Sequence, residues 1–156
     1  MLMRLDSIEE QALFSTVRIE SLDSSRNPIS VGTGFIILCN LGKDANKAYL
    51  ISNKHVLLES DSFRISFVKR KFPHNEPDLG KIVVFRFQYS DSYIELHPDK
   101  DVDIAAIDIT GFVDKYQDSI FIRVLDYDML ATCNEDFLHV SQNVSFVGYP
   151  DDRYDL

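Results

Sequence analysis

The sequence predicts an all-β protein, an antiparallel barrel or sandwich, and three observations lead to this class. Several segments alternate apolar and polar residues with a period of two, which is typical of half-buried strands. Others are short continuous apolar runs bounded by turn-forming residues. The sequence offers no long amphipathic helix to connect parallel strands. With 156 residues, 45% of them hydrophobic, the chain has the length and composition of one domain with its own core.

The first elements expected along the chain are a short helix, a strand and a hairpin. Ser7 and Glu10 have the Ser-x-x-Glu spacing of a capping box, which predicts a helix over about residues 8–12. The stretch "FSTVRIE" then alternates with a period of two and predicts a strand. The apolar runs "GTGFIILC" and "AYLIS" flank the turn-forming stretch "NLGKDANK" and predict a hairpin over residues 33–52.

The second half of the chain predicts further strands around a connector. "FRISF" and "VFRFQY" alternate as half-buried strands do, and "DVDIAAIDI" is a strongly apolar strand. "NVSFVG" predicts a last strand that ends near Gly148. The stretch between these two has weak periodicity and many acids, so we expect a connector with a short helix near residues 112–118. The expected organisation is therefore a β unit over 1–110, a connector over 111–142 and a final strand within 143–156.

Charge and cysteine content exclude several classes of partner and site. The net charge of −9 disfavours nucleic acid and anionic membranes as partners. The N-terminus lacks the apolar core of a signal peptide, and no apolar run approaches the about 18 residues of a bilayer span, so we expect a cytoplasmic protein. Cys39 and Cys133 are expected to be reduced thiols. Neither they nor the histidines have metal-ligand spacing, so no metal or cofactor is expected.

His55, in "LISNKHVLL", is the first candidate functional residue. A single histidine at the end of a strand is commonly a hydrogen-bonded structural residue, and its own context leaves that reading open. Asp103, at the start of an apolar strand, is an ordinary solvated acid on one reading. On the other it lies against the core and needs a partner, for which His55 is the best candidate. Gly32 and Gly34 are interpreted as structural glycines that permit a close approach within a sheet.

Four segments, "GTGFII", "LISNKHVL", "DVDIAAI" and "VSFVGYP", occur in an order and spacing that resemble the trypsin-like (chymotrypsin-fold) serine peptidases, particularly their bacterial intracellular branches. The resemblance covers nearly the whole chain. It implies an antiparallel β-barrel as the first unit and the first strand of a second barrel at the end. It also implies that His55 is the catalytic general base. Asp103, in the Asp-Ile-Ala motif, is the implied acid partner, in preference to Asp101.

The chemistry of acyl transfer agrees with these two roles. A serine nucleophile needs a base, and an imidazole, with an ordinary pKa of about 6.5, can take its proton near neutral pH. A carboxylate bound to one ring nitrogen fixes the tautomer and leaves the other nitrogen for the serine. We therefore expect His55 and Asp103 to meet at hydrogen-bond distance.

The nucleophile expected from the resemblance is missing. In the family the serine lies in a Gly-x-Ser-Gly turn, and neither Ser119, Ser141 nor Ser145 has a neighbouring glycine. We expect the chain to be the N-terminal part of a serine endopeptidase that cleaves protein or peptide substrates, and to be inactive alone. The alternative is a naturally short, non-catalytic interaction module built on the same barrel. For the fragment, apolar surface that the missing second barrel would cover predicts self-association, most simply as a homodimer.

Overall fold

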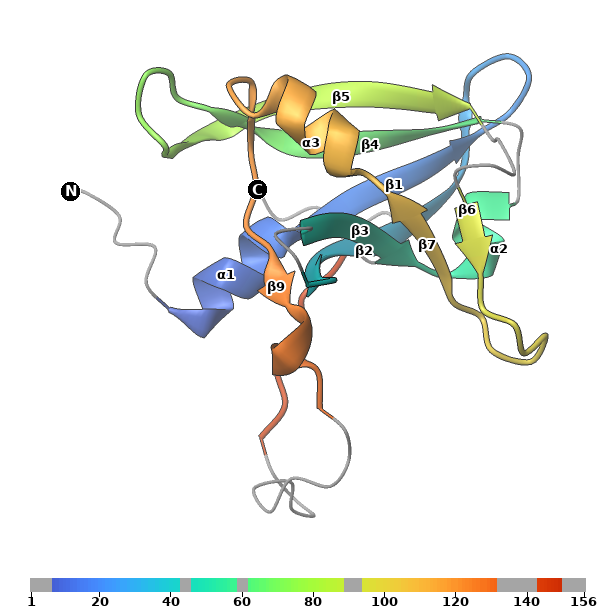
Figure 1. The fold of residues 1–156 in the computed structure, drawn as a ribbon. Helices are drawn as coiled ribbons and strands as arrows, with labels where there is room; N and C mark the ends of the chain where they lie inside the picture. Colours follow the sequence, from blue (N-terminus) through green and yellow to red (C-terminus); the bar gives the residue numbers. More distant parts are fainter. Residues whose placement is uncertain (1–6, 43–45, 59–61, 89–93, 132–142, 150–156) are drawn as a thin grey trace.

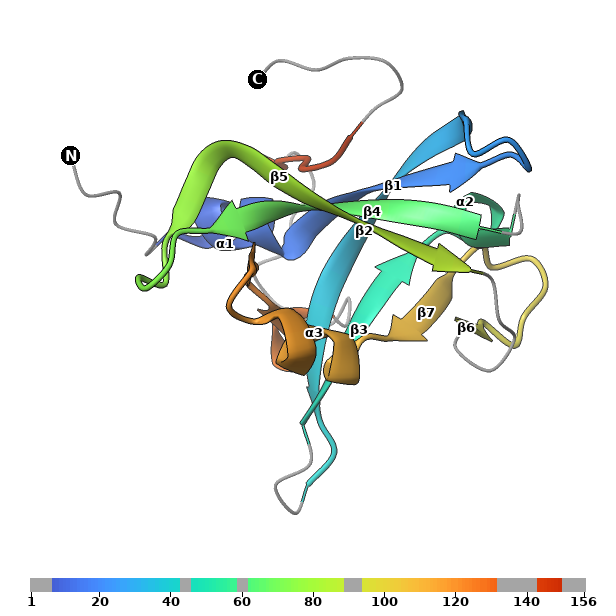
Figure 2. The same cartoon turned by 90° about the horizontal axis from the view of Figure 1, so that it is seen from above.

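The computed structural model describes residues 7–42, 46–58, 62–88, 94–131 and 143–149. In this part of the chain, one sheet of nine strands is accompanied by three short α-helices and a 3-10 helix, η1 (Figure 1; Figure 2 shows the same ribbon from above). In chain order the elements are α1 (Ile8–Ser15), β1 (Thr16–Leu22), β2 (Pro28–Asn40), β3 (Asn46–Ser52), α2 (Lys54–Leu58), β4 (Ser62–Arg70), β5 (Pro77–Gln88), β6 (Ile94–Leu96), β7 (Ala105–Asp108), α3 (Thr110–Tyr116), β8 (Ile120–Phe121), β9 (Leu125–Asp126) and η1 (Tyr127–Met129).

The sheet is antiparallel, as predicted, apart from one short parallel pair. Its strand order is β5-β4-β1-β2-β3-β7-β6, with β8 paired to β4 and β9 paired in parallel to β2. Within it, β4-β1-β2-β3 has the order of a Greek key, in which three consecutive strands are followed by a fourth beside the first. The predicted hairpin is the β2–β3 pair, with register from Phe35 opposite Ile51 to Asn40 opposite Asn46.

The sheet is open, whereas the family resemblance implied a barrel. Its end strands, β5 and β6, do not pair with each other in the described part of the chain. Helix α3 lies beside the inner face of β5 instead (Figure 1). The Phe112 ring of this helix contacts Phe85 and Phe87 of β5, with ring centroids 4.8 and 5.3 Å apart. Aromatic packing against a helix thus takes the place of a closing strand pair.

The core lies on the inner face of the sheet, where the period-two pattern places it. Phe63, Ile65 and Phe67 of β4 are each at most 2% exposed, while the residues between them are only partly buried. Ile19 of β1 and Leu50 of β3 are fully buried in the same cluster. The alternation that predicted these strands therefore also identified their core-facing side chains.

Helix α1 begins where the sequence predicted and ends later. The capping box between Ser7 and Glu10 is present, with both hydrogen bonds formed. The helix continues to Ser15, through residues that the alternating pattern had assigned to a strand. Phe14 accounts for the difference through two contacts with residues far along the chain. Its buried ring packs against the ring of Phe121 in a T-shaped arrangement, with the ring centroids 5.0 Å apart. Its carbonyl accepts a hydrogen bond from the Arg123 amide at 3.0 Å.

The connector contains the short helix expected near residues 112–118, which is α3, but also the strands β8 and β9 and the helix η1. Two-residue strands leave no periodic signal in a sequence, so these elements were not predicted. Their pairing with β4 and β2 ties the connector to the sheet. None of the helices in the described ranges is long and apolar enough to span a bilayer.

Residues 143–149 do not form the last strand that the sequence predicted. No described strand pairs with them, and a strand requires a neighbour for its ladder of hydrogen bonds. The Tyr149 amide instead donates to Oγ1 of Thr33 at 2.7 Å. Val144 and Phe146 are 71% and 94% exposed. The predictions for Cys133, His139 and Ser141 lie outside the described residues.

Candidate active site

Two neighbouring strands bring His55 and Asp103 together. Strand β3 ends at Ser52, and His55 follows in the first turn of α2, rather than at the end of the strand itself. Asp103 lies in the loop that leads into β7. Because Ser52 is directly opposite Ala105 in the β3–β7 pair, the residues just outside this pair lie side by side.

Helix α2 is held against the sheet by its apolar side. Val56 and Leu57 are 3% and 1% exposed, and the Val56 carbonyl accepts a hydrogen bond from Oγ of Ser21 at 2.5 Å. Gly32 of β2 makes this approach possible, since a Cβ there would lie 2.5 and 2.6 Å from the two Val56 methyl groups. A Cβ at Gly34 would similarly meet a methyl of Leu50 at 2.7 Å. The structural interpretation of both glycines is therefore confirmed.

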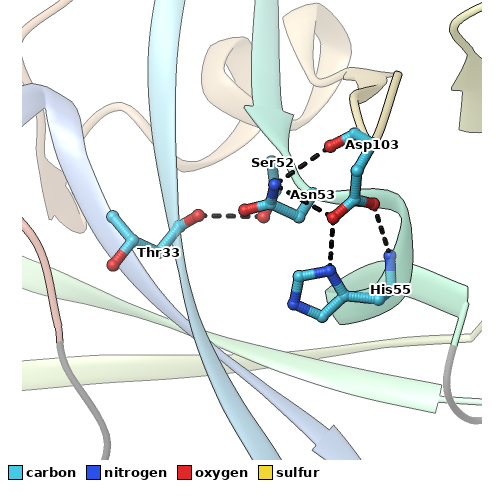
Figure 3. Close-up of polar contacts among 5 residues, drawn as sticks. All are labelled: Thr33, Ser52, Asn53, His55 and Asp103. Carbon is cyan, nitrogen blue, oxygen red and sulfur yellow. Dashed lines mark hydrogen bonds and ion pairs between the residues drawn. The ribbon is translucent and has the colours of Figure 1, made fainter. Parts of the chain in front are cut away.

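The side chains of His55 and Asp103 make the contact that the sequence predicted. Nδ1 of His55 lies 2.5 Å from Oδ2 of Asp103, and the backbone amide of His55 donates to Oδ1 at 3.1 Å (Figure 3). The Asn53 side-chain amide donates to Oδ2 at 3.3 Å and to the Asp103 carbonyl at 3.0 Å. Three groups thus fix the orientation of the carboxylate, and the carboxylate fixes the orientation of the imidazole.

Sequence reasoning assigned no role to Asn53, whose contacts help to hold Asp103. Its neighbour Lys54 adds a second link between α2 and the loop, with Nζ donating to the Asp99 carbonyl at 2.9 Å. Asn53 and Lys54 lie directly between the end of β3 and His55, and this position in the sequence could have identified both as candidates. Ser52, by contrast, binds to the neighbouring strand β2, because its Oγ donates a hydrogen bond to the Thr33 carbonyl at 2.9 Å (Figure 3).

The hydrogen bond from His55 lowers the pKa of Asp103 below its ordinary value, against a smaller opposing effect of desolvation. The carboxylate is therefore ionised at neutral pH. The pair is nevertheless open to solvent, with 68% of the His55 side chain and 46% of the Asp103 side chain exposed. The expectation that Asp103 lies against the core is wrong, because the buried part of the strand begins only at Ala105 and the intervening Ile104 is 46% exposed.

The second ring nitrogen of His55, Nε2, points away from Asp103 (Figure 3). Within the described ranges, it has no hydrogen-bond partner. A neutral imidazole whose Nδ1 proton is bound by a carboxylate has a free lone pair on Nε2. The arrangement can therefore accept a proton at Nε2 from a group that approaches from solvent.

The other sequence candidates take no part in this contact. Ser119 lies in the turn after α3, where its carbonyl accepts a hydrogen bond from the Arg70 amide at 3.0 Å. Ser145 lies in the 143–149 segment. His97 accepts a hydrogen bond from the Asp99 amide at Nδ1. Across the described residues, no cluster of three or more histidine, cysteine or acidic side chains is arranged to hold a metal ion.

Comparison of the chain with protein-family models, with curated proteins and with solved structures found no match. The chemistry of the site must therefore be argued from its geometry.

Proposed function

We propose that His55 and Asp103 are the general base and the orienting acid of a trypsin-like serine peptidase, which hydrolyses peptide bonds. The observation that carries the proposal is the contact of Nδ1 of His55 with Asp103 while Nε2 faces solvent. The antiparallel sheet over residues 16–108 is, on this proposal, an open form of the first barrel of that family.

In the proposed reaction His55 transfers protons, and Asp103 orients and stabilises its ring. The serine hydroxyl loses its proton to Nε2 of His55 as its oxygen attacks the scissile carbonyl carbon. Asp103 keeps the other proton on Nδ1 and stabilises the imidazolium that forms. The imidazolium then returns its proton to the leaving amine as the carbon–nitrogen bond breaks, and the acyl-enzyme is hydrolysed by water in the same sequence of steps.

On this proposal, the serine and the oxyanion-hole donors belong to polypeptide outside these 156 residues, because no Gly-x-Ser-Gly occurs in the sequence. The side chains of His55 and Asp103 are both partly exposed, which is what we expect if a further domain covers this surface in the complete protein. Exclusion of water strengthens the attraction between carboxylate and imidazolium, since the effective dielectric constant falls. A covered pair would be a stronger base system than the half-exposed pair described here.

The test starts from the coding sequence beyond Leu156 and the complete protein that it encodes. We expect a Gly-x-Ser-Gly motif downstream and a serine that reacts with a fluorophosphonate probe. His55→Ala and Asp103→Asn should slow both labelling and peptide cleavage by several orders of magnitude. His74→Ala, which removes an exposed histidine in the loop between β4 and β5, is the matched control and should behave as the wild type.

Two results contradict the proposal: a coding sequence without the serine motif, or labelling that His55→Ala leaves unchanged. The first would favour a non-catalytic interaction module. One observation favours that alternative, namely the apolar side chains of Val144 and Phe146 that project from the 143–149 segment into solvent.

A further inference from the structure

Strand β5 is one of the two end strands of the sheet and pairs with β4 on one side. Its other side pairs with none of the described strands, so within the described residues its backbone amide and carbonyl groups have no ladder partner there. The first part of the strand carries features that prevent pairing. These are Pro77, the positive φ of 78° at Gly80 and a register shift opposite, between Val68 and Arg70 of β4.

From Ile82 to Gln88 such features are absent, and β5 runs in regular register with β4. Arg86 is the one charged residue in this seven-residue stretch. Val83, Phe85 and Phe87 pack against the core, whereas Ile82 and Val84 are 63% and 48% exposed on the outer face. This part of β5 is therefore a regular, apolar edge, which is the kind of edge that pairs with another chain.

A groove of about 970 Å³ lies beside the end of this edge. Apolar side chains from several elements line it, and Arg86 and Gln88 of β5 border it as well. Its other charged lining residues are Glu95 and the ion pair of Lys47 with Asp108, so an apolar side chain, rather than an acidic one, is the group that fits inside it. The large apolar lining residues are Phe63, Phe87, Ile94, Ile107, Ile109 and Phe112. In strand addition the backbone hydrogen bonds supply affinity, and pockets for alternate side chains supply specificity. The groove offers such a pocket for an apolar side chain of an added strand.

The charge distribution decides what kind of strand fits. Residues 62–88, which form β4, β5 and their loop, contain six basic and two acidic residues, a net charge of +4. The rest of the chain contains ten basic and 23 acidic residues, a net charge of −13. Two of the basic residues, Arg64 and Arg70, bind Glu20 and Asp118 from outside the hairpin, which lowers the excess charge to about +2. The β4–β5 hairpin is still a basic region in an acidic protein, and it attracts an acidic partner. Antiparallel pairing of β5 with β5 of a second copy would instead bring two such basic regions together.

We propose that β5 binds an extended acidic segment of another protein by strand addition along Ile82–Gln88. An apolar side chain of the segment enters the groove, and an acidic side chain lies beside Arg86. The site is separate from His55 and Asp103, so the proposal holds whether or not the chain belongs to a peptidase.

The probe for the experiment is a fluorescein-labelled ten-residue peptide of alternating Glu and Val, compared with alternating Lys and Val. Arg86→Glu is the informative variant. Arg86 is exposed and directly opposite Arg64, so the substitution removes a like-charge pair and should not disturb folding. Lys100→Glu, at another exposed position, makes the same change in net charge and is the control.

We expect the Glu-Val peptide to raise fluorescence anisotropy and to protect the amides of Ile82–Gln88 from hydrogen exchange. Arg86→Glu should weaken this binding by about three- to tenfold and allow the Lys-Val peptide to bind, while Lys100→Glu does neither. Absence of binding, equal effects of the two variants, or protection elsewhere would overturn the proposal. So would protection of Ile82–Gln88 that grows with protein concentration without peptide, because the occupant would then be a second copy.

Discussion

Substitution of Gly32 by Ala tests whether close packing between β2 and α2 holds His55 in place. The new Cβ would lie 2.5 and 2.6 Å from the two Val56 methyl groups, whereas carbon atoms in contact are ordinarily about 3.5–4.0 Å apart. About 1 Å of movement is therefore needed. Val56 is buried and its carbonyl is bound to Ser21, so the helix cannot move freely.

We expect Gly32→Ala to lower the free energy of unfolding by about 1–3 kcal/mol, the usual cost of overpacking a core. Val56→Ala removes both methyl groups and should cost about 2 kcal/mol by itself. In the double variant the alanine at position 32 occupies the space that the methyl groups leave. The cost of the double variant should therefore be smaller than the two single costs together, by about 1–3 kcal/mol.

Urea unfolding of the wild type, the two single variants and the double variant measures this coupling. Gly111→Ala is the matched control, because nothing lies within 4 Å of the Cβ it would add. It should be neutral or slightly stabilising, as alanine is favoured over glycine in a helix. Additive costs at positions 32 and 56 would refute the packing argument. So would a Gly32→Ala protein as stable as the wild type.

Three further predictions concern the site and the exposed surface. Asp103→Asn removes a carboxylate whose pKa is lowered in the folded protein. The ionised Asp103 therefore stabilises the wild-type fold fully above the unfolded-state pKa of about 3.9, and this stabilisation is lost as pH falls through the folded-state pKa. Urea unfolding at a series of pH values should show the difference from wild type shrinking in acid, and a difference independent of pH would contradict the assignment. The chain alone should cleave no member of a broad peptide library, since its sequence contains no Gly-x-Ser-Gly turn to supply a nucleophile and oxyanion donors; serine-probe labelling of this chain that depends on His55 would show otherwise. Self-association through the exposed 143–149 segment should appear in light scattering as a mass that rises with concentration, and Phe146→Ser should reduce it; a monomeric mass at every concentration would rule it out.

The parts of the fold that the sequence predicted depend on short-range patterns. Strand β4 alternates Phe63, Ile65 and Phe67 toward the core, so a period of two was enough to identify it and its buried face. The capping box at Ser7 likewise involves residues three apart. The contact between His55 and Asp103 spans 48 positions, and it was predicted through the resemblance of two short motifs to a family rather than through periodicity.

The parts that were not predicted depend on contacts between distant residues. Phe14 belongs to α1 because its ring packs on Phe121, which no local pattern reveals. Phe112 of α3 packs on Phe85 of the end strand β5, and periodicity does not tell whether an end strand lies beside a strand or a helix. The exposure of Asp103 depends on where β7 enters the core, two residues later than the apolar run suggested.

The position of the proton on the neutral His55 ring tests the central claim most directly, because a base that activates serine needs a free lone pair on Nε2. Nitrogen-15 NMR of histidine-labelled protein distinguishes the two tautomers from the chemical shifts of the ring nitrogens. With Nδ1 held by Asp103 at 2.5 Å, we expect the proton on Nδ1 and Nε2 unprotonated, and Asp103→Asn should abolish this preference. A proton on Nε2 of the neutral ring in the wild type would contradict the account.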